Sequence, residues 1–244
     1  MKLIAYLSNG YPSLDDSLRR GIDYVGAGVD IIEADIPSHD PYLDSDYLKK
    51  RILSALDREP DYEKYMASLL ELKKAVPDAG FMVNIYVETL AGIGVDRFSA
   101  FMNDLGEKEV LLVGPEFKGL RSELETLGFY ASSFVTREMC EEDLELASRS
   151  NGFIYLEGFN DNKKYNQEYP ELKDCVAKVR EIIGYKRNIY VGIGVHTPER
   201  LAEVRESGAD GAFLGSMVLK KENDKEEQLK FLRHLRLIAD GALH

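Results

Sequence analysis

Residues 31 to 46 read IIEADIPSHDPYLDSD and hold the side chains best suited to acid–base chemistry. Glu33 follows two isoleucines, and Asp44 follows a loop that contains Pro37 and Pro41. Burial among apolar residues raises the pKa of a carboxyl group, and proteins keep such groups mostly where they transfer protons. The pattern therefore predicts Glu33 as the principal catalytic residue.

A second carboxylate belongs to the same predicted strand. Side-chain alternation places Ile31, Glu33 and Asp35 on one face of it. If that face is interior, the two carboxylates repel each other and one pKa rises further, which suits a general acid or base near neutral pH. The competing interpretation is a structural ion pair, in which a lysine or arginine from elsewhere neutralises Glu33 or Asp35.

Residues 189 to 220 place glycines directly after two predicted strands. Gly194 precedes a helical segment, and Gly215 and Ser216 follow the last strand. Glycine lets backbone amides approach a ligand closely, and the start of a helix favours an anion. This region therefore predicts a phosphate-binding site, with ordinary tight turns as the alternative.

Short β-rich runs alternate with helical patterns along the whole chain, as in parallel βαβ units. Eight such cycles in 244 residues predict an α/β fold, a single (β/α)8 TIM barrel with residues 1–244 as one domain. In such a barrel the catalytic groups lie at the carboxyl ends of the strands. The predicted strands are residues 3–8, 30–35, 81–86, 109–113, 129–134, 152–156, 188–191 and 211–214.

Composition restricts the classes of partner. The formal net charge of −12 argues against nucleic acid and against an anionic membrane surface, since both require clustered basic residues. Cys140 and Cys175 show no metal-ligand spacing, so we expect no metal site. The first apolar run is too short for a signal peptide, which predicts a soluble, cytoplasmic protein.

Several motifs resemble the tryptophan synthase alpha chain family, from Tyr6 to about Lys220. The likeness centres on a strand glutamate followed by Pro, Asp-Pro and a further Asp, with Glu33 and Asp44 eleven positions apart as in the family. The other matching segments are YLSNGYPSLDDSL, IYVETLAGIGVDRF with Tyr86, GFIYL with Tyr155, and GIG followed by TPERL and GADGAFLGSMVLK.

The resemblance implies a lyase of tryptophan biosynthesis that needs no cofactor. Its reaction is the retro-aldol cleavage of indole-3-glycerol phosphate to indole and glyceraldehyde 3-phosphate. Glu33 would move the protons, and Asp44 would stay ionised and accept the indole N–H. Tyr86 and Tyr155 would line the substrate pocket, while Gly194, Gly215 and Ser216 would bind the phosphate.

The chain also departs from the family pattern around the predicted pocket. Asp35 and Ser45 replace glycines, Gly114 replaces an aspartate, and His39 occupies a loop position where serine is usual. Asp35 and His39 are therefore predicted to contact the substrate. These departures distinguish the chain from a typical member and favour a divergent one.

The loop after the predicted sixth strand differs as well. Residues 160 to 169 are a candidate lid without the family's Ser-Gly-x-Thr-Gly element, with a mobile surface loop as the alternative. Lys163 and Lys164 are candidate phosphate contacts, although a lysine pair in a loop is more often only solvated. The family implies a tryptophan synthase beta chain as partner, but Tyr11 stands where an acidic interface residue is usual. Two alternatives stay open: a different carbon–carbon lyase or aldolase reaction on another phosphorylated substrate, and a catalytically silent interaction subunit.

Overall fold

The computed structural model describes residues 1–115, 117, 119–160 and 165–243. The described chain divides into two compact units. Unit 1 contains residues 1–5, 27–30 and 132–243, and unit 2 contains residues 6–26 and 31–131, apart from the positions outside the described ranges. In each unit, parallel strands alternate with helices along the sequence.

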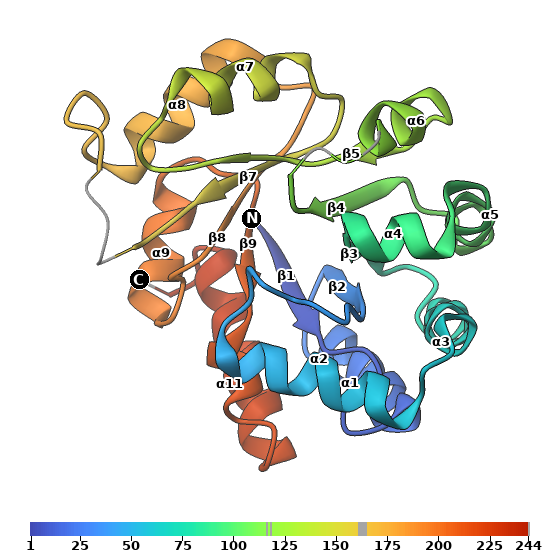
Figure 1. Cartoon of the computed structure of the whole chain (residues 1–244). Coiled ribbons are helices and arrows are strands. Elements are labelled where there is room, and N and C mark those ends of the chain that lie inside the picture. The colour runs from blue at the N-terminus through green and yellow to red at the C-terminus, as the bar shows by residue number, and fades with distance from the viewer. Residues whose placement is uncertain (116, 118, 161–164, 244) are drawn as a thin grey trace. The chain divides into compact units, whose positions relative to one another are not determined.

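Unit 2 is built on the parallel strands β2 to β5, paired in that order (Figure 1). Among its helices, α3 packs against α1 and α5, and α5 packs against α4 and α6. The elements are α1 (Leu14–Gly26), β2 (Ile31–Ile36), α2 (Asp46–Arg58), α3 (Tyr62–Ala75), β3 (Gly80–Tyr86), α4 (Val87–Ile93), α5 (Val95–Leu105), β4 (Glu109–Val113), α6 (Leu120–Thr126) and β5 (Tyr130–Ala131).

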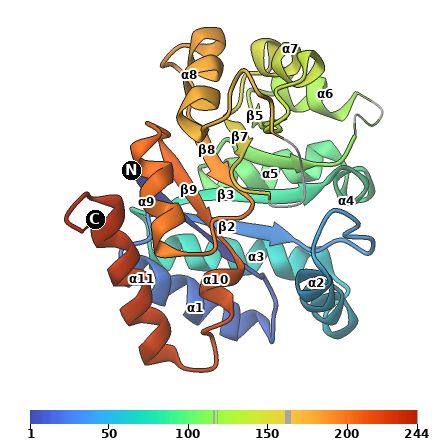
Figure 2. The ribbon, with the colours of Figure 1, turned by 90° about the vertical axis from the view of Figure 1, so that its left-hand side faces the viewer.

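Unit 1 pairs β1 with β9, β9 with β8, β8 with β7 and β7 with β6, all in parallel. Helices α9 and α11 pack together beside this part of the sheet (Figure 2). The elements are β1 (Lys2–Leu7), β6 (Ser133–Val135), α7 (Glu141–Arg149), β7 (Ile154–Glu157), α8 (Leu172–Ile183), β8 (Ile189–Gly192), α9 (Pro198–Glu206), β9 (Gly211–Leu214), α10 (Ser216–Leu219) and α11 (Lys225–Ala239). The last two residues of β1 belong to unit 2.

Seven of the predicted strands are found, within one or two residues of their observed ends. The segment 129–134 differs from its prediction, because it forms two short strands rather than one. Tyr130 and Ala131 pair with β4, whereas residues 133–135 pair with β7. Ser132 marks the change of partner, so the apolar run identified a β segment but not the switch within it.

The register of β2 on β3 decides which side chains meet in unit 2. Glu33 lies beside Met82, and Asp35 lies beside Asn84. Because neighbours in register share a face of a sheet, the two carboxylates and Asn84 point to the same side. Ile32 on the opposite face is fully buried as well, so β2 is covered on both sides.

Helix packing in unit 2 depends on a close approach at Gly21. A Cβ at this position in α1 would lie 2.5 Å from Leu72 Cδ2 in α3, and Leu72 itself is buried. Gly26 ends the same helix, and a Cβ there would meet no other atom within 4 Å. Gly21 therefore permits the close contact between α1 and α3, whereas Gly26 has room for a larger side chain.

None of the helices within the described residues has the length and apolar character needed to span a membrane.

We expect Gly21→Val to lower the free energy of unfolding by about 1–3 kcal/mol, because the added methyl groups must displace Leu72 from a packed core. The same substitution at Gly26 is the control and should change stability by less than about 0.5 kcal/mol. Urea denaturation of both variants measures the difference. Equal stability of the two variants would contradict this account of the contact between α1 and α3.

Candidate functional site

Two buried carboxylates lie on β2, Glu33 at the third of its six residues and Asp35 at the fifth, next to the carboxyl end. The residues Glu33 and Asp35 are only 7% and 4% exposed. The Asn84 side-chain amide donates a hydrogen bond of 2.9 Å to Glu33 Oε1. Asp35 Oδ1 instead accepts a 2.7 Å hydrogen bond from the backbone N–H of Asn9. Neutral amides, rather than cations, donate these hydrogen bonds to both carboxylates, which argues against the structural ion pair.

Burial raises the pKa of Glu33 to about 8. The hydrogen bond from Asn84 opposes this shift, while the negative charges of Asp44 and Asp35 add to it. A carboxylic acid with this pKa keeps its proton at neutral pH and can therefore donate it to a substrate.

Asp35 responds to the same environment. Burial raises its pKa to about 7, opposed first by the hydrogen bond from the Asn9 backbone. The charge of Asp44 raises this pKa as well. Near neutral pH, Asp35 is therefore divided between its protonated form, which can donate a hydrogen bond, and its ionised form, which can only accept one.

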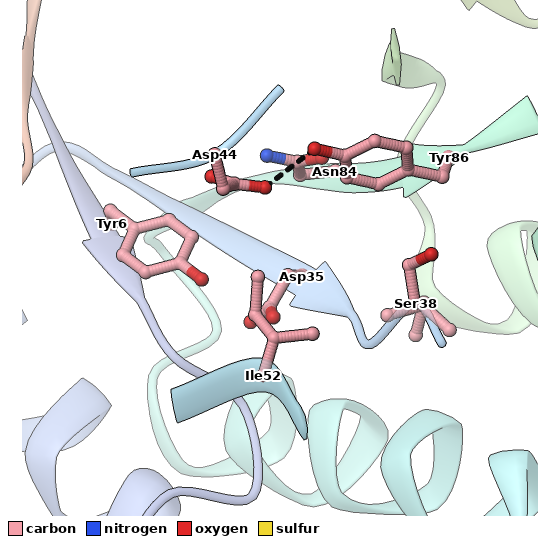
Figure 3. Close-up of a pocket in the computed structure, with 8 residues that line it drawn as sticks. Tyr6, Asp35, Ser38, Asp44, Ile52, Asn84 and Tyr86 are labelled. Carbon is pink, nitrogen blue, oxygen red and sulfur yellow. Dashed lines mark hydrogen bonds between the residues drawn. The ribbon is translucent and has the colours of Figure 1, made fainter. Parts of the chain in front are cut away.

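The loop after β2 brings Asp44 to the end of β3. The Tyr86 hydroxyl donates a hydrogen bond of 2.6 Å to Asp44 Oδ2, drawn as a dashed line in Figure 3. The backbone N–H of Leu43 donates to the same hydroxyl at 3.2 Å, and Tyr42 packs edge-on against the Tyr86 ring. Burial raises the pKa of Asp44, whereas the Tyr86 hydrogen bond and the charge of Lys49 lower it.

A small cavity of about 10 Å³ lies among these groups (Figure 3). Asp35, Asp44 and Asn84 all line it, so two of the three acidic groups face one space. Glu33 joins this arrangement through its hydrogen bond with Asn84. The remaining lining residues are Tyr6, Ile36, Ser38, Ile52 and Tyr86.

His39 lies apart from this cavity lining. Its side chain is exposed, and its ring meets Tyr62 edge-on with ring centroids 6.3 Å apart. Ser38, the residue before it, lines the cavity instead. Substrate contact by His39 stays a prediction.

The other predicted site residues belong to unit 1. Tyr155 on β7 stacks on Phe213 with ring centroids 4.5 Å apart, and its ring lies over Gly192 at the end of β8. Gly215 caps α10 without a side-chain hydrogen bond, and Ser216 begins this helix. Both are partly exposed. Lys163 and Lys164 lie outside the described residues.

Gly194 has a packing reason to be glycine. Its φ is +76°, and a Cβ would lie 1.9 Å from the Phe159 carbonyl oxygen. The segment after β7 therefore runs against the segment after β8, with the Phe159 N–H donating to the Ile193 carbonyl at 3.0 Å. The Gly194 carbonyl accepts hydrogen bonds from the His196 N–H and from Arg200.

Sequence reasoning missed Asn84 and Tyr6. Asn84 is the polar residue in the strand FMVNIY, and it lies among apolar neighbours as Glu33 does. The argument used for Glu33 could have identified it. Tyr6 gave no comparable signal, because an aromatic residue in a strand most often serves the core.

Parallel strands alternate with helices in both units, and acidic side chains lie on β2 and in the loop after it, which is the pattern of an α/β enzyme. The structure of the tryptophan synthase alpha subunit from Legionella pneumophila is similar, with a TM-score of 0.82 and 21% identity. The match covers 98% of this chain and 93% of that one. A tryptophan synthase structure from M. tuberculosis matches with a TM-score of 0.81, 21% identity and coverage of 98% and 92%. These matches confirm the predicted (β/α)8 barrel, while the assignment of residues 1–244 to one domain stays a prediction.

Comparison of the sequence with known proteins identifies the family. The family model described as tryptophan synthase alpha chain matches residues 1–240, and this chain belongs to that family. The tryptophan synthase alpha chain of Dehalococcoides mccartyi is 28% identical over 254 aligned residues, covering 98% of this chain and 95% of the relative. That of Aquifex aeolicus is 26% identical over 234 residues, covering 92% and 87%. The resemblance inferred from the motifs is confirmed.

The raised pKa of Glu33 predicts a dependence of stability on pH. Between its usual value of 4.5 and about 8, the folded chain holds the Glu33 proton and the unfolded chain does not. Each pH unit of rise in this window therefore costs the folded state up to about 1.4 kcal/mol. Glu33→Gln removes this cost, so the variant should gain stability relative to the native chain as pH rises.

Urea denaturation at several pH values measures this difference, with the same substitution at exposed Glu141 as the control. A constant difference between native chain and Glu33→Gln across the window would show that Glu33 titrates normally.

Proposed function

We propose that the chain is a carbon–carbon lyase that cleaves indole-3-glycerol phosphate to indole and glyceraldehyde 3-phosphate, with Glu33 moving the protons. The observation that carries the proposal is the buried Glu33 side chain, whose pKa of about 8 leaves it protonated at neutral pH. Family membership supplies the reaction. Asp35 and Asp44 lie at and beyond the carboxyl end of β2, which is where (β/α)8 barrels build catalytic sites.

The reaction requires one proton to be delivered and one to be removed. The Glu33 carboxylic acid gives its proton to C3 of the indole, which places positive charge on the ring nitrogen. The resulting carboxylate takes the proton of the adjacent glycerol hydroxyl. The bond between C3 and the glycerol carbon that bears this hydroxyl then breaks. Its electron pair restores the aromatic ring, and the glycerol carbon becomes the aldehyde carbon. Glu33 ends protonated, as it began.

Asp44 suits the task of stabilising the positive ring. As a carboxylate it would accept the indole N–H and offset the charge that develops on nitrogen. The hydrogen bond from Tyr86 favours the ionised form of Asp44 and fixes its direction. Tyr86 then acts by positioning Asp44 as well as by lining the cavity.

The phosphate would be bound by unit 1. We assign it to the backbone amides of Gly194, Gly215 and Ser216 and to the Ser216 hydroxyl. The open amide end of α10, which lacks a side-chain cap, supports this assignment. Tyr155, half-buried on β7, would contribute to the substrate pocket.

We also propose a tryptophan synthase beta chain as partner, and the cytoplasm as the place of action, on the basis of the family. Tyr11 changes the expected interface. Its ring lies over the buried Arg51 guanidinium, 4.1 Å from the ring centroid, so this position presents a phenol rather than an acid.

A second candidate function is a related lyase or aldolase reaction on a different phosphorylated substrate. Asp35 favours it, because a buried carboxylate in the cavity lining is an unusual neighbour for an apolar ring. A silent interaction subunit has less support, since Glu33, Asp44 and Asn84 form an ordered acidic site.

Glu33→Gln should lower the kcat for indole release by about 10²- to 10⁴-fold, because the amide can neither give nor take the proton. Glu109→Gln is a matched control. Glu109 also has a pKa raised by burial, to about 7, but it is the first residue of β4, at the amino end of the strands. Its variant should keep the native kcat.

Indole release from purified protein and indole-3-glycerol phosphate measures both variants. Equal rates for the native chain and Glu33→Gln would contradict the proposed mechanism. Absence of indole from the native chain, alone and with a beta chain added, would contradict the proposed substrate.

A further inference from the structure

Buried polar atoms without hydrogen-bond partners gather near the carboxyl ends of β1 and β2. Among the described residues, these atoms are Tyr6 Oη, Ser8 Oγ, Asn9 Oδ1 and Asp35 Oδ2. Their residues are 5% exposed or less. An unpaired buried polar group costs about 1–3 kcal/mol, so a cluster of them points to a group that binds there.

Two of these atoms belong to residues that line the same small cavity. Figure 3 shows the Tyr6 hydroxyl on the side of its ring that faces Asp35. This hydroxyl is near enough to lower the pKa of Asp35, although the geometry between the two groups forms no hydrogen bond. The backbone N–H of Asn9 holds Asp35 Oδ1, which leaves Oδ2 as the atom available to a ligand. The space of about 10 Å³ accommodates roughly one water-sized group.

The chemistry of the two atoms restricts the group that fits between them. Burial raises the pKa of Tyr6 well above its usual value, with the charge of Asp35 as the next cause, so the phenol keeps its proton and can donate it. An ionised Asp35 Oδ2 can only accept. A hydroxyl satisfies both, because it accepts one hydrogen bond and donates another.

We propose that Tyr6 and Asp35 form a specificity subsite for a hydroxyl group on the aromatic ring of the substrate. The chain then acts on a ring-hydroxylated indole-3-glycerol phosphate in preference to the unsubstituted compound. This inference rests on the proposed lyase function for the choice of ring. It assigns Asp35 to substrate recognition and leaves proton transfer to Glu33.

The binding test uses indole and the four hydroxyindoles with a hydroxyl at position 4, 5, 6 or 7. Dissociation constants come from NMR titration of the native chain, Asp35→Gly and Asp40→Gly. One hydroxyindole should bind the native chain about tenfold more tightly than indole, because its hydroxyl forms hydrogen bonds with Tyr6 and Asp35 that indole cannot form. Asp35→Gly should reduce this ratio to about one.

Asp40→Gly is the matched control. It removes an exposed carboxylate from the loop after β2, and the ratio should stay at the native value. Tyr6→Phe keeps the ring and removes the hydroxyl, so it should lower the binding preference for the hydroxyindole over indole. Thermal unfolding of each variant shows whether it is folded.

Three outcomes would overturn the subsite: no hydroxyindole preferred over indole, an unchanged preference in Asp35→Gly, or no binding of any of the five compounds. Turnover separates this inference from the proposed function. Cleavage of indole-3-glycerol phosphate without preference for hydroxylated forms overturns only the subsite. A hydroxyindole preference that depends on Asp35, without cleavage of either phosphorylated compound, overturns the lyase function, and with it the choice of substrate, but supports the hydroxyl subsite.

Discussion

The removal of water from the carboxyl end of β2 is the constraint on which the candidate site depends. Glu33 and Asp35 are buried there, and for both of them desolvation is the largest cause of the raised pKa. Each carboxylate receives a hydrogen bond from an amide, which makes burial tolerable without ionising the group fully. A lysine or arginine at the same place would have kept both groups ionised and removed the proton that the proposed mechanism needs.

The fold provides this environment through the register of two strands. Pairing of Asp35 with Asn84 puts the Asn84 amide within reach of Glu33, which lies two residues before Asp35 on the same face of β2. The turn after β1 brings the Asn9 N–H to Asp35, and the loop after β2 brings Asp44 to Tyr86. The chemistry of unit 2 thus comes from three strand ends and the loops that follow them.

Much of this arrangement could be predicted from the sequence. Alternation of apolar and polar residues located β2 and put Glu33 and Asp35 on one face, and the spacing to Asp44 identified the family. Side-chain partners could not be predicted in this way, because they depend on the register between strands far apart in sequence. The hydrogen bond between Asn84 and Glu33 was missed for that reason, as was the change of pairing partner at Ser132. Tyr6 was missed because an aromatic residue in a strand most often serves the core.

Asp35 departs from the family pattern, and the structure shows hydrogen bonding at its carboxyl group that the sequence alone did not reveal. A sequence comparison shows only an acid in place of a small residue. The structure shows that one of its oxygens is held by Asn9 and that the other, with the Tyr6 hydroxyl, lacks a partner among the described residues. Glu33, the proposed acid–base group, and Asp35, which distinguishes this chain, are therefore two residues apart on one strand and have separate proposed roles.

Direct titration of the Glu33 carboxyl group tests the central claim most closely. The measurement is the pH dependence of the side-chain carboxyl carbon shifts in protein labelled with ¹³C-glutamate, with Glu33→Gln identifying the resonance. A transition near a pKa of about 8 would establish that burial keeps Glu33 protonated at neutral pH. A transition near the ordinary value of 4.5 would show an ionised Glu33 and contradict its role as the proton donor.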